Sequence, residues 1–221
     1  MKTKLFGLFL IVLVLSSKGT FAQTSNTNPL PQFVFPAFTK GVVKMKSGDN
    51  YSALFNYNMV DEEMIFNNKG QYMALENISA VDTIIIGARK FVPAQKVFYE
   101  VITKGTLSLY IQHKSKYTDQ GTPTAYGMTS KTNSSESFNS IKGGNQIRTL
   151  DLPDNVVVTP EFVYWAKVND EMKKFTSERQ FLKIFPAKET ELKDFIKKNG
   201  IEIEKREDLI RLGTYCNEIL K

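Results

Sequence analysis

The feature that most constrains this chain is the close spacing of turn signals between residues 38 and 114. Clusters of Gly, Asn, Asp and Lys stand at residues 47–50, 67–70 and 104–105, and the segments between them are short and rich in β-branched and aromatic residues. Such segments are typical of antiparallel strands joined by tight turns. The spacing predicts about seven strands in this stretch, in a sheet that curls or packs on itself.

Strand-like sequence returns only after a long polar stretch. Residues 114–156 are rich in Ser, Thr, Asn, Gly and Lys, which predicts a long loop, either a binding loop or a tolerated insertion. Beyond the loop, Phe162–Val168 and Met172–Phe175 flank the turn signal Asn169-Asp170. We therefore expect a further pair of strands before the C-terminal region begins.

The C-terminal end has helical periodicity. Ser177 and Gln180 have the spacing of a capping box, and Asn199-Gly200 is typical of a helix C-terminus. A last helix over residues 205–220 is predicted by the apolar stripe of Leu209, Leu212, Cys216 and Ile219. Strands followed by helices predict an α+β fold. We expect an antiparallel β-meander sheet or sandwich followed by two or three short C-terminal α-helices.

The first 22 residues form a three-part pattern. Lys2 and Lys4 precede an apolar run from Leu5 to Leu15, and Thr20-Phe21-Ala22 places small residues at the −3 and −1 positions of a cleavage site. This pattern predicts a secretory signal peptide. The apolar run of about 11 residues is shorter than the roughly 20 that span a bilayer. We therefore expect export to the periplasm or the extracellular space.

Composition narrows the class of protein further. The content of hydrophobic residues, 42%, excludes disorder throughout, and a single cysteine excludes a disulfide scaffold. Removing residues 1–22 takes away three lysines and no acid, which lowers the net charge from +6 to +3. A charge of this size implies no particular partner. Acids and lysines alternate near the C-terminus, which predicts a solvated helix face and no nucleic-acid partner. No later segment holds about 18 consecutive apolar residues, so we expect no membrane span in the mature chain.

These patterns divide the chain into four segments. Residues 1–22 are the signal peptide, and residues 23–32, with two prolines, are expected to form a flexible N-terminal tether. An antiparallel β domain over residues 33–176 contains the polar loop, and a helical segment over residues 177–221 packs on it.

The chain has few residues for metal or nucleophilic chemistry. His113 and Cys216 are its only histidine and cysteine, which makes a zinc site or a Ser–His or Cys–His pair improbable. Asp61-Glu62-Glu63 places three carboxylates together, where they could hold a calcium ion or decorate a hairpin loop. The sequence contains no motif for a nucleotide or another cofactor, and we predict none.

Three single residues remain as candidates for chemistry. Glu100 is the most suggestive acid for hydrolysis, because it lies in a predicted strand, although we expect it to face outward as an ordinary strand residue. His113 is expected to be exposed at a strand end. Cys216 is expected on the buried stripe of the last helix, with a cross-link between two chains as the alternative. We therefore name no catalytic, cofactor-binding or metal-binding residues.

Aromatic residues cluster near the start of the β domain and near the polar loop. They could form a stacking surface for sugars or belong to the core and to cross-strand pairs. The residues in question are Phe33, Phe35, Phe38, Tyr110, Tyr117 and Tyr126.

Several short motifs combine a β-rich region with a helical end. They are Gly41-Val42-Val43-x-Met45, Leu54-Phe55-Asn56-Tyr57-Asn58, Val81–Ile86, Phe181-Leu182-x-Ile184-Phe185-Pro186, Phe195-Ile196-Lys197-Lys198-Asn199, Asp208-Leu209-Ile210 and Tyr215-Cys216-Asn217. In these motifs the chain resembles uncharacterised secreted, β-rich proteins of Gram-negative bacteria that carry a C-terminal helical segment. The resemblance implies an envelope location and carries no activity or functional residue.

The leading hypothesis is an exported cell-envelope protein that acts as a non-enzymatic binding or structural module. Its partner would be an envelope protein or a glycan. One alternative is a secreted hydrolase that uses a carboxylate pair such as Glu100 and Asp61. Another is a small-molecule carrier whose curled sheet encloses an apolar cavity. The sequence leaves the ligand and the oligomeric state open.

Overall fold

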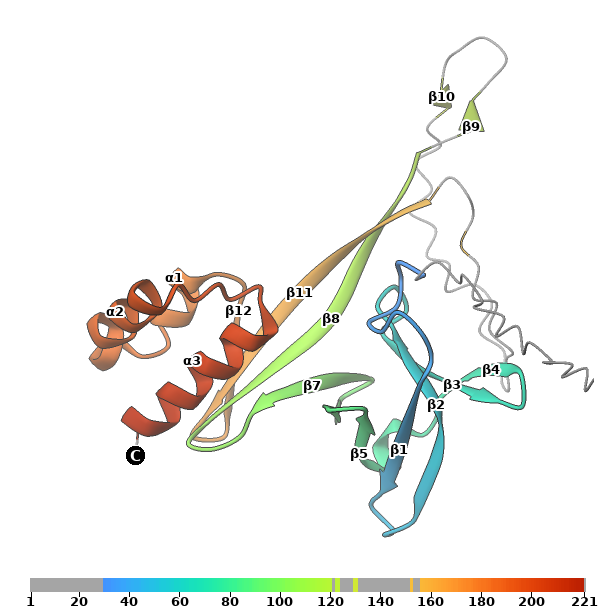
Figure 1. The fold of residues 1–221 in the computed structure, drawn as a ribbon, viewed down its shortest axis with the longest axis horizontal. Coiled ribbons are helices and arrows are strands. Elements are labelled where there is room, and N and C mark those ends of the chain that lie inside the picture. The colour runs from blue at the N-terminus through green and yellow to red at the C-terminus, as the bar shows by residue number, and fades with distance from the viewer. Residues whose placement is uncertain (1–29, 121, 124–128, 131–151, 153–155, 221) are drawn as a thin grey trace, which may run out of the picture.

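The structure of the protein is a computed structural model that describes residues 30–120, 122–123, 129–130, 152 and 156–220. The predicted signal peptide and most of the predicted loop lie outside these residues. Within them, a ten-stranded antiparallel sheet is followed by C-terminal helices, which confirms the predicted α+β class (Figure 1). No helix in the described part of the chain is long and apolar enough to cross a membrane.

The elements follow the predicted order of strands and then helices. The strands of the large sheet are β1 (Thr39–Met45), β2 (Asn50–Asn58), β3 (Glu63–Asn68), β4 (Gln71–Ala74), β5 (Val81–Ile86), β6 (Arg89–Ala94), β7 (Val97–Thr103), β8 (Leu107–Asp119), β11 (Val156–Val168) and β12 (Glu171–Phe175). The short strands β9 (Thr122–Pro123) and β10 (Thr129–Ser130) pair with each other. The helical elements are the 3-10 turns η1 (Ile78–Ala80) and η3 (Pro186–Lys188) and the helices α1 (Glu178–Leu182), α2 (Glu189–Asn199) and α3 (Arg206–Ile219).

The sheet departs from a pure meander at one position. Its strand order is β12-β11-β8-β7-β6-β5-β1-β2-β3-β4, so β5 pairs with β1 and not with β4, its neighbour in sequence. The strand β8 also continues to Asp119, past the predicted start of the polar loop at residue 114. It stays extended because it pairs with β11 as far as Val156↔Asp119.

The sheet curls, as the strand spacing predicts. The strand β3 lies near β7, although four strands separate them in the sheet. The backbone N–H of Ser115 on β8 donates to the carbonyl of Met59, in the turn after β2, at 3.0 Å. Residues at the end of the predicted tether join this contact, because Met59 N–H donates to the carbonyl of Gln32, which is buried. The turn after β2 therefore closes against β8.

The pairing register assigns side chains to two faces. The inner face carries the row Phe91, Glu100, Ile111, Tyr164 and Phe175, across β6 to β12. The outer face carries the neighbouring row Lys90, Val101, Tyr110, Trp165 and Lys174. Since successive side chains along a strand point to opposite faces, these two rows also show which face their neighbours on the same strands point to.

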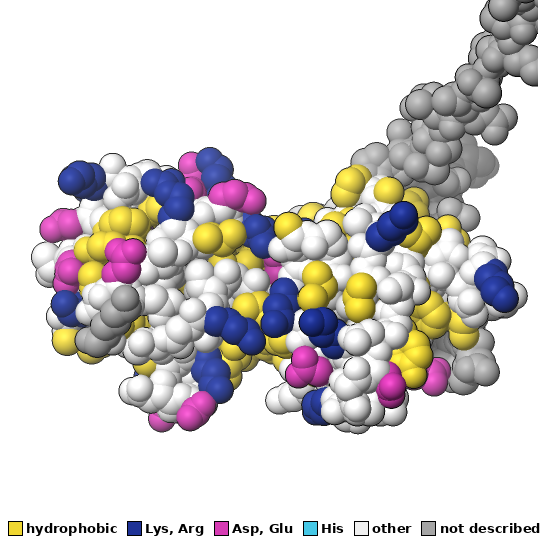
Figure 2. Space-filling model, turned by 60° about the horizontal axis from the view of Figure 1, so that its bottom comes forward, with side chains coloured by type: hydrophobic (Ala, Val, Ile, Leu, Met, Phe, Trp, Pro, Cys, Tyr) yellow, Lys and Arg dark blue, Asp and Glu magenta, His cyan; other side chains and the backbone are white. Residues whose placement is uncertain are grey.

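Two hydrophobic cores cover the inner face. One lies between β8, β11 and β12 and the C-terminal helices, and includes Phe175, Phe181 and Leu212. The other lies inside the curl of β1 to β7 and includes Phe55, Tyr57 and Phe91. Figure 1 shows the helices beside the β8–β11 half and the strands β1 to β5 in the other half. The molecule accordingly has two lobes joined at a narrower waist (Figure 2).

Local signals account for the ends of the elements. Asn169 and Asp170 both have positive φ, 51° and 65°, as a two-residue hairpin turn requires. The Ser177 hydroxyl accepts the N–H of Gln180 at 3.3 Å, and Gly200 ends α2 in the left-handed conformation. These features confirm the predicted turn and the helix boundaries read from the sequence.

Candidate functional site

Glu100 lies on the inner face, where its side chain is 0% exposed, and not outward as an ordinary strand residue would. Its Oε1 accepts from Arg89 Nε at 2.8 Å and from Arg206 Nε at 2.6 Å. Its Oε2 accepts from Arg89 Nη2 and from His113 Nε2, the latter at 2.8 Å. Because a strand alone cannot supply these donors, the burial of Glu100 depends on β6, β8 and α3 together.

These contacts keep the Glu100 carboxyl ionised. Burial acts to raise its pKa, but the hydrogen bonds from His113 and Arg89, with the charge of Arg89, outweigh burial and lower the pKa to about 2. A general acid needs a proton near the working pH. Glu100 is therefore the central anion of an ion cluster. An ionised carboxylate of this kind does not fit the role of a proton donor.

His113 is buried, at 3% exposure, and the prediction that it is exposed was wrong. Phe162, Tyr57 and Phe91 surround its ring. Burial lowers the pKa of His113, although the bond to Glu100 opposes this shift. A carboxylate only accepts hydrogen bonds, so Nε2 carries the hydrogen and the buried Nδ1 is the bare nitrogen of a neutral ring.

The second acid of the suggested carboxylate pair, Asp61, is not among the partners of Glu100, which are Arg89, Arg206 and His113. Asp61 is in the turn between β2 and β3, where its Oδ2 accepts from Asn58 Nδ2 at 2.9 Å. Its neighbour Glu62 accepts from Gln112 Nε2 at 2.6 Å and pairs with Lys114 at 3.1 Å. Among the described residues, no three His, Cys, Asp or Glu side chains gather closely enough to hold a metal ion. The acidic turn serves instead to attach the β2–β3 connection to β8.

Cys216 lies on the buried face of α3, as predicted. Its side chain is fully buried, and burial raises the pKa of the thiol to about 12. A thiol in this state is protonated and out of reach of a second chain. The structure therefore does not favour a cross-link between chains.

The aromatic candidates separate into different environments. Phe33 and Phe38 contact each other edge to face, and Phe35 lies against Phe91 and under the Arg89 guanidinium. Tyr117 lies on β8 opposite Val158. Tyr126 lies outside the described residues. Of these candidates, Tyr110 lines a cleft on the outer face of the sheet.

That cleft has a volume of about 460 Å³ and is rich in aromatic side chains. The rings of Tyr99 and Trp165 stack with their centroids 5.6 Å apart and their planes 16° apart. Tyr110 lies directly opposite Trp165 in the pairing of β8 with β11. Met172 on β12, 42% exposed, forms part of the wall. Four adjacent strands, β7, β8, β11 and β12, thus place the three rings and the methionine together.

Polar groups hold the aromatic cleft in shape. Trp165 Nε1 donates to Gln112 Oε1 at 3.2 Å, and Gln112 in turn donates to Glu62. Burial and the nearby Glu62 carboxylate raise the pKa of Tyr99, so its hydroxyl is a hydrogen-bond donor at neutral pH. The ion pair of Lys167 and Asp170, 2.8 Å long, also lines the cleft.

Sequence reasoning found Tyr110 but missed Tyr99 and Trp165 as its partners. The available signal was alternation, since Trp165 faces away from Tyr164 and Tyr99 faces away from Glu100. Alternation assigns each ring to a face of its own strand. It does not say that β7 and β11 lie on either side of β8, which is what brings the rings together.

Comparison with known proteins adds no family to this picture. No protein-family model, curated protein or solved structure matches the chain. The resemblance to secreted β-rich proteins of Gram-negative bacteria stays a prediction from the sequence.

Proposed function

We propose that this protein is an exported, non-enzymatic binding module of the cell envelope, and that its aromatic cleft holds a sugar ring of a glycan. Export is supported by the three-part pattern in residues 1–22. Binding is supported by one observation above all. Tyr99, Tyr110 and Trp165 line a single cleft on the outer face of the sheet.

A sugar ring suits the chemistry of this cleft. Aromatic faces are electron-rich, so they attract the slightly positive C–H groups on one face of a pyranose. The hydroxyl groups of the sugar need hydrogen-bond partners at the edge of the same site. Gln95, Lys167 and Asp170 line the cleft and offer amide, ammonium and carboxylate groups. The combination favours a ring that is apolar on its faces and polar at its rim.

The two alternative functions receive less support from the geometry. The hydrolase would need two carboxylates that can reach a substrate, but Glu100 is 0% exposed and its oxygens accept hydrogen bonds from three side chains. The carrier would need an apolar space inside the curl. There, Phe55, Tyr57 and Phe91 are buried and pack together in the core.

The test uses the fluorescence of Trp165, which is the only tryptophan in the chain. Mature protein, residues 23–221, is titrated with pentasaccharides of glucose, mannose and N-acetylglucosamine. We expect a saturable change in tryptophan emission with at least one of them. Tyr99→Ala should weaken that binding about 3- to 10-fold, because it removes one aromatic contact.

Tyr51→Ala is the matched control, since Tyr51 is an exposed tyrosine on β2 outside the cleft. It should leave the affinity unchanged, and circular dichroism should show that both variants are folded. If no sugar changes the emission, or if Tyr99→Ala binds as tightly as the wild type, the aromatic cleft is not a glycan site.

A further inference from the structure

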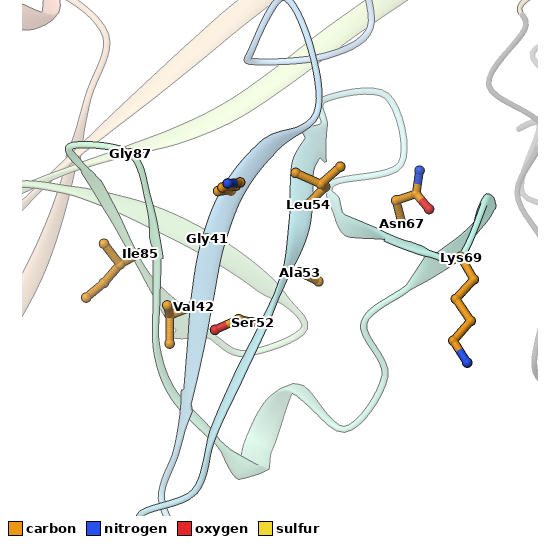
Figure 3. A pocket seen from close by; sticks show the side chains of 10 residues that line it. Gly41, Val42, Ser52, Ala53, Leu54, Asn67, Lys69, Ile85 and Gly87 are labelled. Atoms are coloured by element: carbon orange, nitrogen blue, oxygen red, sulfur yellow. The ribbon is translucent and has the colours of Figure 1, made fainter.

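A second depression lies on the outer face, over β1, β2, β3 and β5 (Figure 3). We call it the β1–β2 groove. In Figure 3, Val42 on β1 stands between Ile85 on β5 and Ser52 on β2, with Leu54, Asn67 and Lys69 beyond. The groove has a volume of about 690 Å³. It shares no lining residue with the aromatic cleft.

The β1–β2 groove is lined by apolar side chains that are not part of the hydrophobic core. Val42 pairs with Ile85 and with Ser52, so all three face outward. Leu54 is in the same outward register and is 38% exposed. The opposite face of these strands is already filled by Val43, Phe55 and the other residues of the curl core. The outward residues therefore form a separate apolar surface that is open to a ligand.

Lysines border this apolar surface. Lys40 and Lys69 are among the ten lining residues, and no lining residue is acidic. Lys44 is on the outward face of β1, and Lys90, on β6, pairs with Ile85 of β5. None of the four lysines forms an ion pair with a residue that the structure describes. Their charges are free to attract an anion.

We propose that the β1–β2 groove binds a fatty acid, with the acyl chain on Val42, Leu54 and Ile85 and the carboxylate among the lysines. Charge complementarity selects the anion, because the groove lining has cations and no acid. The volume is in the range of small-molecule sites, which run from about 300 to 1,000 Å³. This site is independent of the proposed glycan cleft.

The test is calorimetric titration of the mature protein with monomeric sodium dodecanoate. We expect one bound molecule per chain, with an affinity that weakens as salt is added. Dodecyltrimethylammonium, which has the same chain and a positive head, should not bind. Double substitution of Lys40→Glu and Lys69→Glu should weaken dodecanoate binding by about tenfold or more, because attraction becomes repulsion.

Double substitution of Lys193→Glu and Lys197→Glu provides a matched control, since it makes the same change of charge at two exposed positions on α2. Its affinity should equal that of the wild type. Leu54→Asp should also weaken binding, which tests the apolar half of the site. Circular dichroism should show that all variants are folded.

Three results would overturn the fatty-acid site. Equal binding of the cationic amphiphile would remove the role of the lysines. Binding to anionic phospholipid vesicles, with none to monomeric dodecanoate, would identify a membrane surface as the ligand instead. A change in Trp165 emission that pentasaccharides reverse would place dodecanoate in the aromatic cleft, and that result would leave the glycan proposal standing.

Discussion

Glu100 is the residue at which the two cores of this protein meet. In the register of β6, β7 and β8 it stands between Phe91, which belongs to the curl core, and Ile111, which belongs to the helix-covered core. Arg89 and Arg206 reach it from β6 and α3. A buried charge in this position is tolerated only because its partners are hydrogen-bonded to it. Removing Glu100 leaves two half-buried arginines without their shared anion, and removing either arginine takes a donor from the buried carboxylate.

Glu100→Gln should therefore lower the free energy of unfolding at pH 7 by about 3–5 kcal/mol, the usual cost of breaking a buried ion pair. The folded-state pKa of Glu100 is lowered from 4.5 to about 2, so its stabilisation is complete above pH 4.5 and is lost as the pH falls toward 2. Urea unfolding at pH 7, 4 and 2.5 should show the difference between wild type and variant shrinking. Glu161→Gln, at the more exposed pair with Lys116, should cost about 1 kcal/mol or less. An equal cost at pH 2.5 and pH 7 would contradict the ionised state of Glu100.

At the scale of elements, α3 docks on β7 and β8 through a few specific contacts. Asn217 Oδ1 accepts the backbone N–H of Leu107 at 2.8 Å, and Asn217 Nδ2 donates to the carbonyl of the same residue at 2.9 Å. Gly213 brings the helix backbone close to the sheet, since a Cβ there would come within 3.0 Å of Thr103 and Leu109. The amide therefore holds the start of β8 against a closely packed helix.

We predict that Asn217→Ala lowers the free energy of unfolding by about 2–3 kcal/mol, because the backbone groups of Leu107 lose both partners. The measurement is the urea midpoint at pH 7, followed by far-UV circular dichroism. Glu218→Ala, the exposed neighbour on the same helix, should change stability by no more than about 0.5 kcal/mol. Equal stabilities of the two variants would show that the helix is held by its apolar stripe alone.

The whole molecule is two cores on one continuous sheet. The strands β6, β7 and β8 are paired in sequence from the curl to the helix-covered half, with one shift of register between Val101 and Thr103. The Met59 carbonyl also accepts a backbone hydrogen bond from Ser115, which ties the curl back to β8. Backbone pairing and the Glu100 cluster both cross the boundary between the curl core and the helix-covered core. We infer that the two halves unfold as one unit.

Phe55→Ala tests this inference, because Phe55 is buried in the curl core while Trp165 lies on the other half. The substitution should cost about 3–5 kcal/mol. Tryptophan fluorescence and far-UV circular dichroism should then give the same shifted urea midpoint. Val157→Ala, which shortens an exposed side chain, is the control. A tryptophan transition that stays at the wild-type midpoint would mean that the halves unfold separately.

Short-range patterns in the sequence determined the elements of this fold. The turn at Asn169-Asp170, the cap formed by Ser177 and Gln180, and the end of α2 at Gly200 were all predictable, because each depends on residues within one turn of the chain. The buried stripe of α3 with Cys216 follows from helical periodicity in the same way. These signals were sufficient for the α+β class and the order of elements.

The tertiary structure alone decided which elements are neighbours and what each face meets. Alternation showed that Glu100 and Tyr99 point to opposite faces of β7, but the sequence does not contain the arrangement that puts Arg206 beside one and Trp165 beside the other. The partners in these contacts are 106 and 66 residues away. The pairing of β5 with β1 was hidden for the same reason. Strand propensity is a local property, whereas the choice of partner strand depends on the packing of the whole chain.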